Sequence, residues 1–196
     1  MINETVIQAL TDFATKENVR VAEPLSKHTT FRIGGNADLF VEIENENQLS
    51  NILEYLKREN LPFLVMGNGS NLLVSDFGFR GIVLQISKKM SQIHVEGNLI
   101  VAKAGALMSQ VAAAAYQNHL TGLEFASGIP GTIGGGVVMN AGAYDGELKM
   151  VIEYVKVVDS CGKISTLSNE EMKFGYRDSL IKHSDLIVLY ITKRSL

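Results

Sequence analysis

Apolar residues recur at helical spacing in three stretches of the chain, residues 3–16, 46–59 and 104–119. In the second stretch, leucine and isoleucine fall at i, i+3, i+4 and i+7, which places them on one face of a helix. Asn3 stands before the first apolar position as a candidate N-cap. We therefore expect three amphipathic helices.

Short runs of apolar and β-branched residues predict strands between and after these helices. The Gly97-Asn98 and Cys161-Gly162 pairs predict hairpin turns, and we expect a domain boundary near Phe79-Arg80. This divides the chain into a small α/β lobe, residues 1–80, and a larger α+β lobe, residues 81–196. The expected strands are 19–21, 38–43, 62–66, 82–86, 93–95, 99–102, 154–158, 163–166 and 186–191.

Composition excludes several classes of protein. The 196 residues carry a net charge of −3 with no basic run, which argues against a nucleic-acid partner. A single cysteine, Cys161, rules out an internal disulfide and favours a reducing cytoplasm. The longest uncharged stretch, residues 104–123, contains polar side chains, so we expect no membrane span. The N-terminus lacks the pattern of a signal peptide.

Glycine is concentrated in the middle of the chain. Residues 127–144 contain six glycines, interleaved with packed apolar residues unlike those of a flexible linker. Glycine costs backbone entropy in regular structure, so this run indicates close approach by a ligand or another chain. The alternative is glycine for tight helix packing.

A second glycine-containing loop, residues 67–71, follows a predicted strand. Its sequence, Gly-Asn-Gly-Ser-Asn, can point successive N–H groups at an anion such as a pyrophosphate. It is neither a dinucleotide-binding Rossmann turn nor a P-loop, and a plain turn is the alternative. Together the two segments suggest a flat, phosphate-bearing cofactor that lies against backbone.

Five motifs, in order along residues 20–190, resemble the UDP-N-acetylenolpyruvoylglucosamine reductase (MurB) family. They are residues 28–35 (HTTFRIGG), 67–74 (GNGSNLLV), 127–135 (SGIPGTIGG), 140–144 (NAGAY) and 176–179 (YRDS). The resemblance implies the two-lobed α+β, PCMH-type FAD-binding fold of vanillyl-alcohol oxidase relatives. It also implies bound FAD, NADPH as co-substrate, and reduction of a nucleotide sugar, UDP-N-acetylglucosamine enolpyruvate, to UDP-N-acetylmuramate for peptidoglycan.

The same resemblance implies roles for individual residues. Arg177 would stabilise negative charge on the substrate, and Tyr176 would contact the substrate beside it. The cofactor would be bound by Met66, Gly67, Asn68, Gly69, Ser70, Asn71, Leu72, Ser127, Gly128, Ile129, Pro130, Gly131, Thr132, Gly134, Gly135, Asn140, Gly142, Ala143 and Tyr144.

The family also uses a proton-donating serine and an assisting glutamate in a C-terminal substrate-binding domain. Neither can be placed in this sequence, and Ser195 does not match the serine motif. We therefore expect impaired activity, and self-association through surface that the missing domain would cover. The alternatives are a non-catalytic FAD-binding fragment and another flavin oxidoreductase of the same superfold.

No metal site is expected. His28, His94, His119 and His183 have no spacing that converges on a metal, and one cysteine cannot complete a zinc set. We interpret the histidines as core or solvated side chains.

Overall fold

The computed structural model describes residues 2–194, and the chain divides into two compact units. The first unit comprises Met1–Lys89 and Ser160–Gly162, and the second comprises Met90–Asp159 and Lys163–Leu196. Each unit has its own sheet.

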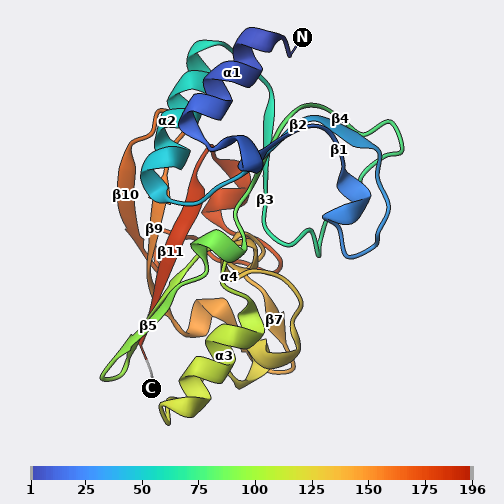
Figure 1. The fold of residues 1–196 in the computed structure, drawn as a ribbon. Helices are drawn as coiled ribbons and strands as arrows, with labels where there is room; N and C mark the ends of the chain where they lie inside the picture. The colour runs from blue at the N-terminus through green and yellow to red at the C-terminus, as the bar shows by residue number, and fades with distance from the viewer. Residues whose placement is uncertain (1, 195–196) are drawn as a thin grey trace. The chain divides into compact units, whose positions relative to one another are not determined.

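The sheet of the first unit has the strand order β1-β2-β4-β3 (Figure 1). Strand β1 (Val19–Pro24) is antiparallel to β2 (Asn36–Glu42), and β4 (Phe79–Gln85) is parallel to both β2 and β3 (Phe63–Met66). Because β4 lies between β2 and β3, the first unit extends to Lys89 rather than ending at the expected boundary near residue 80.

Two predicted helices of the first unit are confirmed, and side-chain caps fix where they begin. Asn3 Oδ1 accepts a hydrogen bond from Val6 N at 3.0 Å at the start of α1 (Glu4–Phe13). Asn45 caps α2 (Glu46–Arg58) in the same way. Helices α1 and α2 lie side by side (Figure 1).

Both faces of this first sheet are covered. Successive side chains of a strand point to opposite faces, and in β2 Leu39 and Phe40 are both fully buried. Phe40 packs with Leu25, Met66 and Val83 in one cluster of the core. This cluster supports the end of β3, where the predicted phosphate-binding loop begins.

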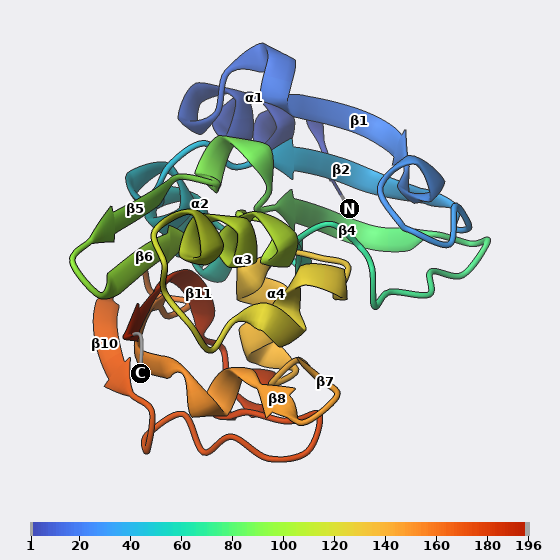
Figure 2. The ribbon, with the colours of Figure 1, turned by 90° about the horizontal axis from the view of Figure 1, so that it is seen from below.

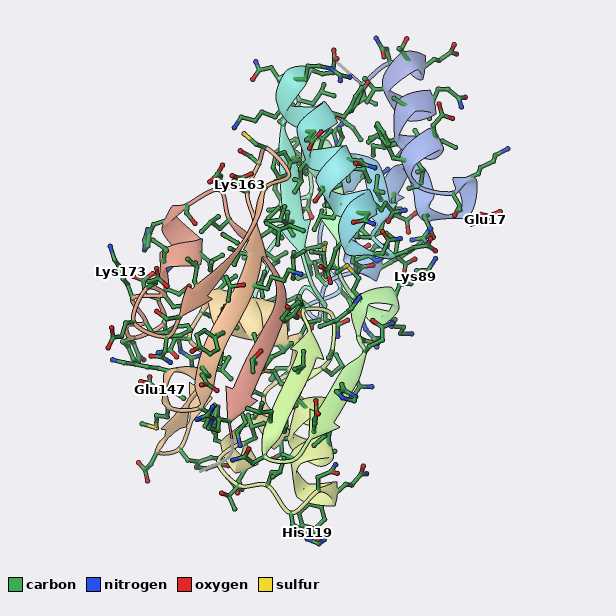
Figure 3. The ribbon with its side chains drawn as sticks, turned by 90° about the vertical axis from the view of Figure 1, so that its left-hand side faces the viewer. Glu17, Lys89, His119, Glu147, Lys163 and Lys173 are labelled. Carbon is green, nitrogen blue, oxygen red and sulfur yellow. The ribbon has the colours of Figure 1, made fainter. Side chains whose placement is uncertain are left out.

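The second unit contains a five-stranded antiparallel sheet, drawn with its side chains in Figure 3. The expected turns at Gly97 and Gly162 have positive φ, +56° and +78°. In the order β10-β9-β11-β6-β5, the strands are β10 (Ile164–Ser168), β9 (Ile152–Val158), β11 (Ile187–Arg194), β6 (Leu99–Lys103) and β5 (Ile93–Glu96).

Helix α3 (Met108–Gln117) matches the third predicted helix, but α4 (Ile133–Val138) lies in the glycine run and was not predicted. Glycine disfavours helix formation, so packing must stabilise α4. A Cβ on Gly134 would lie 2.7 Å from Ala104 Cβ, which shows how closely α4 approaches its neighbours. Figure 2 shows α3 and α4 side by side.

A short hairpin, β7 (Gly142–Ala143) and β8 (Gly146–Glu147), follows α4. No helix within residues 2–194 is long and apolar enough to cross a membrane. The 3-10 helices are η1 (Lys16–Asn18), η2 (Leu25–Lys27), η3 (Lys88–Met90), η4 (Glu124–Gly128), η5 (Leu148–Met150) and η6 (Leu180–His183).

Candidate cofactor site

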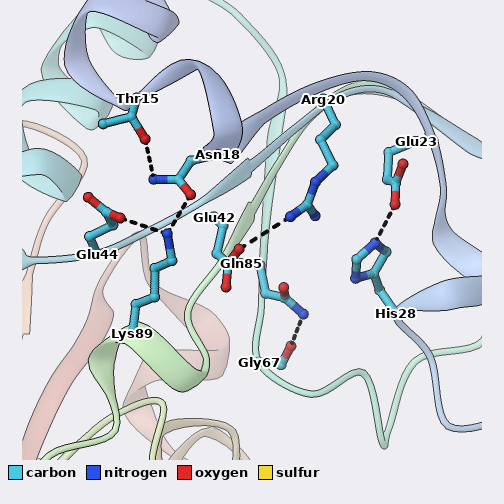
Figure 4. A network of polar contacts seen from close by, with 10 residues as sticks. All are labelled: Thr15, Asn18, Arg20, Glu23, His28, Glu42, Glu44, Gly67, Gln85 and Lys89. Atoms are coloured by element: carbon cyan, nitrogen blue, oxygen red, sulfur yellow. Dashed lines mark hydrogen bonds and ion pairs between the residues drawn. The ribbon is translucent and has the colours of Figure 1, made fainter.

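The loop 67–71 leaves the end of β3 and is held there by its neighbour β4. Ile86 N donates to Met66 O at 2.9 Å. The buried Gln85 side chain donates from Nε2 to Gly67 O at 3.2 Å (Figure 4). The loop therefore begins from a fixed backbone position.

The segment 28–30 packs against the loop 67–71 at Gly69. Gly69 has φ +63°, and a Cβ there would lie 2.1 Å from His28 O and 2.9 Å from Thr29 Cα. Thr30 N donates to Gly69 O at 3.2 Å. Glycine at position 69 is thus required by the protein itself, through both a left-handed backbone and a backbone-to-backbone contact.

The imidazole ring of His28 contacts two side chains, those of Glu23 and Phe40. Its Nε2 lies 2.9 Å from Glu23 Oε1 (Figure 4). The ring stacks on Phe40 with centroids 4.1 Å apart. This agrees with the expectation of a structural histidine, and it ties the supporting segment to the core.

Several backbone N–H groups of the loop have no acceptor. Among the described residues, the N–H groups of Gly67, Asn68, Gly69 and Asn71 donate no hydrogen bond, although Gly69 is buried. Buried N–H groups are normally paired, and successive unpaired ones can bind an anion. The loop thus fits a phosphate group, whereas Met66 and Leu72 direct their side chains into the core cluster.

In the second unit, the segment 127–135 is fastened at its C-terminal end. Ile133 N donates to Ala106 O at 2.7 Å, and Gly134 N donates to Ala104 O at 2.9 Å. The buried Thr132 caps α4 by accepting a hydrogen bond from Gly135 N at 3.3 Å. These contacts fix the backbone of residues 132–135.

Two glycines of this segment are not required by any contact or backbone conformation among the described residues. No described protein atom lies within 4 Å of a Cβ built on Gly128, and the nearest atom to one on Gly135 is Thr132 Oγ1 at 3.5 Å. Neither residue has positive φ. Bare backbone that the protein does not need leaves room for a ligand to approach, so the segment fits a flat cofactor.

The third predicted segment, residues 140–144, has structural reasons for its small and polar residues. A Cβ on Gly142 would lie 2.7 Å from Gly146 O, across the β7–β8 hairpin. Tyr144 is fully exposed with φ +54°. Asn140 is buried and uses its amide within the protein, in part to hold Glu147, which Figure 3 labels. Direct cofactor contact by residues 140–144 stays a prediction.

Tyr176 and Arg177 lie in a tight turn of the second unit. Gly175 N donates to Asp178 O at 3.0 Å, and Asp178 N donates to Gly175 O at 3.2 Å. Both side chains between them are exposed, and Arg177 has φ +53°. Within residues 2–194 the guanidinium of Arg177 forms no ion pair, so its charge is not neutralised by a neighbouring carboxylate.

Asp178, the acidic residue of this turn, interacts with two basic side chains, His183 and Lys182. His183 Nε2 lies 2.7 Å from Asp178 Oδ1, and this hydrogen bond holds the pKa of Asp178 below its ordinary value. Lys182 Nζ lies 3.7 Å from the same oxygen and acts in the same direction. Asp178 is therefore ionised and directed at His183 and Lys182.

The sequence motifs do not include Gln85, and for Asn140 they imply cofactor binding rather than backbone support. The backbone that Gln85, Asn140 and His28 contact, at Gly67, Gly175 and Gly69, lies 18 to 41 residues away, so no local pattern reveals these contacts. The HTTFRIGG motif was the available signal for His28. No group of three or more metal-ligating side chains occurs within the described residues.

The chain matches the family model described as FAD binding domain over residues 37–168. It therefore belongs to this family of FAD-binding domains, and FAD is its cofactor. The fold agrees: p-cresol methylhydroxylase superposes with a TM-score of 0.71 at 17% identity, covering 97% of this chain and 42% of that one. The expected two-lobed α+β FAD-binding fold is thus confirmed.

More similar relatives are named UDP-N-acetylenolpyruvoylglucosamine reductase. Those of Clostridioides difficile and Geobacillus thermodenitrificans are 43% and 47% identical over 96% of this chain. The chain spans 62% of the length of each. The MurB crystal structure from Thermus caldophilus has a TM-score of 0.76 at 32% identity and covers 91% of this chain and 64% of its own. The resemblance found in the five motifs is confirmed.

Proposed function

We propose that this chain is the FAD-binding part of a reductase that acts on UDP-N-acetylglucosamine enolpyruvate with NADPH. In the first unit, the loop 67–71 would bind the diphosphate of FAD. In the second unit, the segments 127–135 and 140–144 are the proposed cofactor-binding segments. The observation that supports this site best is the open glycine backbone at Gly128 and Gly135, which nothing in the described chain requires. The reaction itself rests on the similarity to the reductases.

FAD, when bound, supplies hydride transfer between NADPH and the enolpyruvyl double bond. The chain's own residues bind the cofactor and stabilise charge. Addition of hydride to the methylene carbon leaves negative charge that spreads onto the substrate carboxylate. The Arg177 guanidinium, which is exposed and has no carboxylate partner within residues 2–194, stabilises that charge, and Tyr176 contacts the substrate beside it.

The remaining expectations follow from this proposal. A nucleotide-sugar substrate and a single cysteine fit a cytoplasmic protein that serves peptidoglycan precursor synthesis. Self-association is expected of a chain that spans 62% of the length of these relatives. Nucleic acid and membrane are not expected as partners.

The visible absorption spectrum of the purified chain tests the cofactor. We expect a flavin spectrum, or its appearance on titration with FAD. A colourless chain that takes up no FAD contradicts the proposed site.

Oxidation of NADPH, with and without the enolpyruvyl substrate, tests the reaction. We expect oxidation that depends on this substrate and is slower than that of a full-length relative. Flavin binding without substrate-dependent oxidation would favour a non-catalytic FAD-binding module. Oxidation or reduction of a different alcohol would indicate another member of the superfold.

A further inference from the structure

Asn140 is the buried polar residue at the end of α4. It is 3% exposed, and its backbone is left-handed with φ +40°. A left-handed, non-glycine residue is uncommon and costs free energy, although asparagine tolerates it better than most residues. The surrounding contacts must therefore hold Asn140 in place.

Both donor hydrogens of the Asn140 carboxamide are used inside the second unit. Nδ2 donates to Glu147 Oε2 at 3.0 Å and to Gly175 O at 2.9 Å. Oδ1 accepts a hydrogen bond from Lys149 N at 2.9 Å. An amide group has two donor hydrogens, so no donor of this side chain remains for a cofactor.

The contact with Gly175 joins two of the predicted site segments. Gly175 begins the tight turn that carries Tyr176 and Arg177, and its carbonyl accepts from both Asn140 and Asp178 N. On the far side of the turn, the buried Ser179 donates from Oγ to Val138 O at 2.9 Å. Hydrogen bonds thus join both sides of the turn to the C-terminal end of α4, Gly175 through Asn140 and Ser179 through Val138.

We propose that Asn140 is a positioning residue for Arg177, rather than a direct ligand of FAD. By holding Gly175, it fixes the backbone from which the Arg177 side chain extends. This inference rests on the proposed function, because it assumes that Arg177 acts beside the flavin. It assigns a role to an amide whose two donor hydrogens are already used within the second unit.

The first test uses the chain without FAD and measures whether the hydrogen bonds of Asn140 stabilise the turn at Gly175. Asn140→Gly removes the amide and suits the left-handed backbone, and Asn140→Asp keeps the shape but lacks the amide donor. Asn169→Ala is the matched control, because Asn169 Nδ2 also holds two carbonyls, of Lys149 and Ile152, away from the turn. Amide hydrogen exchange at Gly175 and Asp178, measured by NMR, reports the turn.

We expect exchange at these two amides to accelerate about tenfold in both Asn140 variants, the effect of losing a buried hydrogen bond. The Asn169→Ala chain should keep the wild-type rates at Gly175 and Asp178. Unchanged rates in either folded Asn140 variant would overturn the proposal, as would equal acceleration in the control.

The second test uses the FAD-loaded chain and sulfite. Sulfite adds to N5 of an oxidised flavin and leaves negative charge on the ring, which a nearby guanidinium stabilises. We expect Arg177→Ala to weaken sulfite binding about tenfold, Asn140→Gly to weaken it severalfold, and the double variant to match Arg177→Ala. Asn169→Ala should leave it unchanged.

The outcomes separate the two claims. If Arg177→Ala leaves sulfite binding unchanged, the place of Arg177 beside the flavin is wrong. If Arg177→Ala weakens it but Asn140→Gly does not, or if the two losses add in full, Arg177 keeps its place and the positioning role of Asn140 is wrong.

Discussion

The two glycine-rich segments use glycine for different reasons. In the loop of the first unit, a side chain on Gly69 would collide with the backbone of His28 and Thr29. In the segment of the second unit, a side chain on Gly128 would meet no described protein atom. Gly69 in the first loop is therefore needed to fold the protein, whereas Gly128 in the second segment is free to serve a ligand.

The contacts around each glycine therefore show whether it serves the stability of the fold or the binding of a ligand. The number of glycines in a segment does not show this. A substitution that clashes with the chain lowers the free energy of unfolding. One that only fills ligand space lowers affinity and leaves the fold intact.

The largest effect is expected for Gly69→Val. Overpacking against backbone and a left-handed β-branched residue together should lower the free energy of unfolding by about 3 kcal/mol or more, measured by urea denaturation. Gly97→Val is the control, because Gly97 has φ +56° but nothing within 4 Å of its Cβ site. Equal losses in the two variants would show that the His28 contact contributes nothing.

A smaller effect is expected for Gln85→Leu. This substitution keeps the volume but removes the hydrogen bond to Gly67 O and leaves that carbonyl without its partner. We expect a loss of about 1–2 kcal/mol in stability and a severalfold weaker affinity for FAD. Calorimetric titration with FAD measures the second effect, and an unaltered affinity would show that Gln85 does not position the loop.

Gly135→Ala should act in the opposite direction on stability. Position 135 lies in α4, and its Cβ would make only an ordinary contact with Thr132. Alanine should raise the free energy of unfolding of the apo chain by about 0.5–1 kcal/mol, while FAD binds more weakly. A destabilised Gly135→Ala chain would contradict the assignment of this glycine to the ligand.

Lys193 provides a pH-dependent effect, the smallest of the set. Its side chain is fully buried, Nζ donates to Thr121 O at 2.5 Å, and burial lowers its pKa while Glu124 partly opposes the shift. The folded state releases this proton at lower pH than the unfolded state. Stability relative to Lys193→Met should thus rise as pH increases through the folded pKa toward the unfolded value, about 10.4. A pH-independent difference in urea denaturation would contradict this.

Local patterns predicted most elements but not the pairing of distant ones. Helical spacing and the Asn3 cap located α1 and α2, because both signals lie within a few residues. The place of β4 between β2 and β3 depends on non-local parallel pairing, so the expected boundary fell inside the first unit. Helix α4 was missed because its glycines disfavour a helix except where Ala104 and Met108 pack against them.

The candidate site shows the same limit. The motifs located both glycine-rich segments and the turn at Arg177, but not which glycines the protein itself requires. That distinction depends on a carbonyl at His28, 41 residues before Gly69, and on empty space around Gly128. Neither the position of this carbonyl nor the space around Gly128 can be read from the spacing of residues in the sequence.

The most direct test of this account is to measure FAD affinity and apo stability together for Gly128→Val. We predict a free energy of unfolding within about 1 kcal/mol of wild type and an affinity for FAD lowered about 100-fold or more. A variant that binds FAD as tightly as wild type would contradict the claim that this bare backbone holds the cofactor.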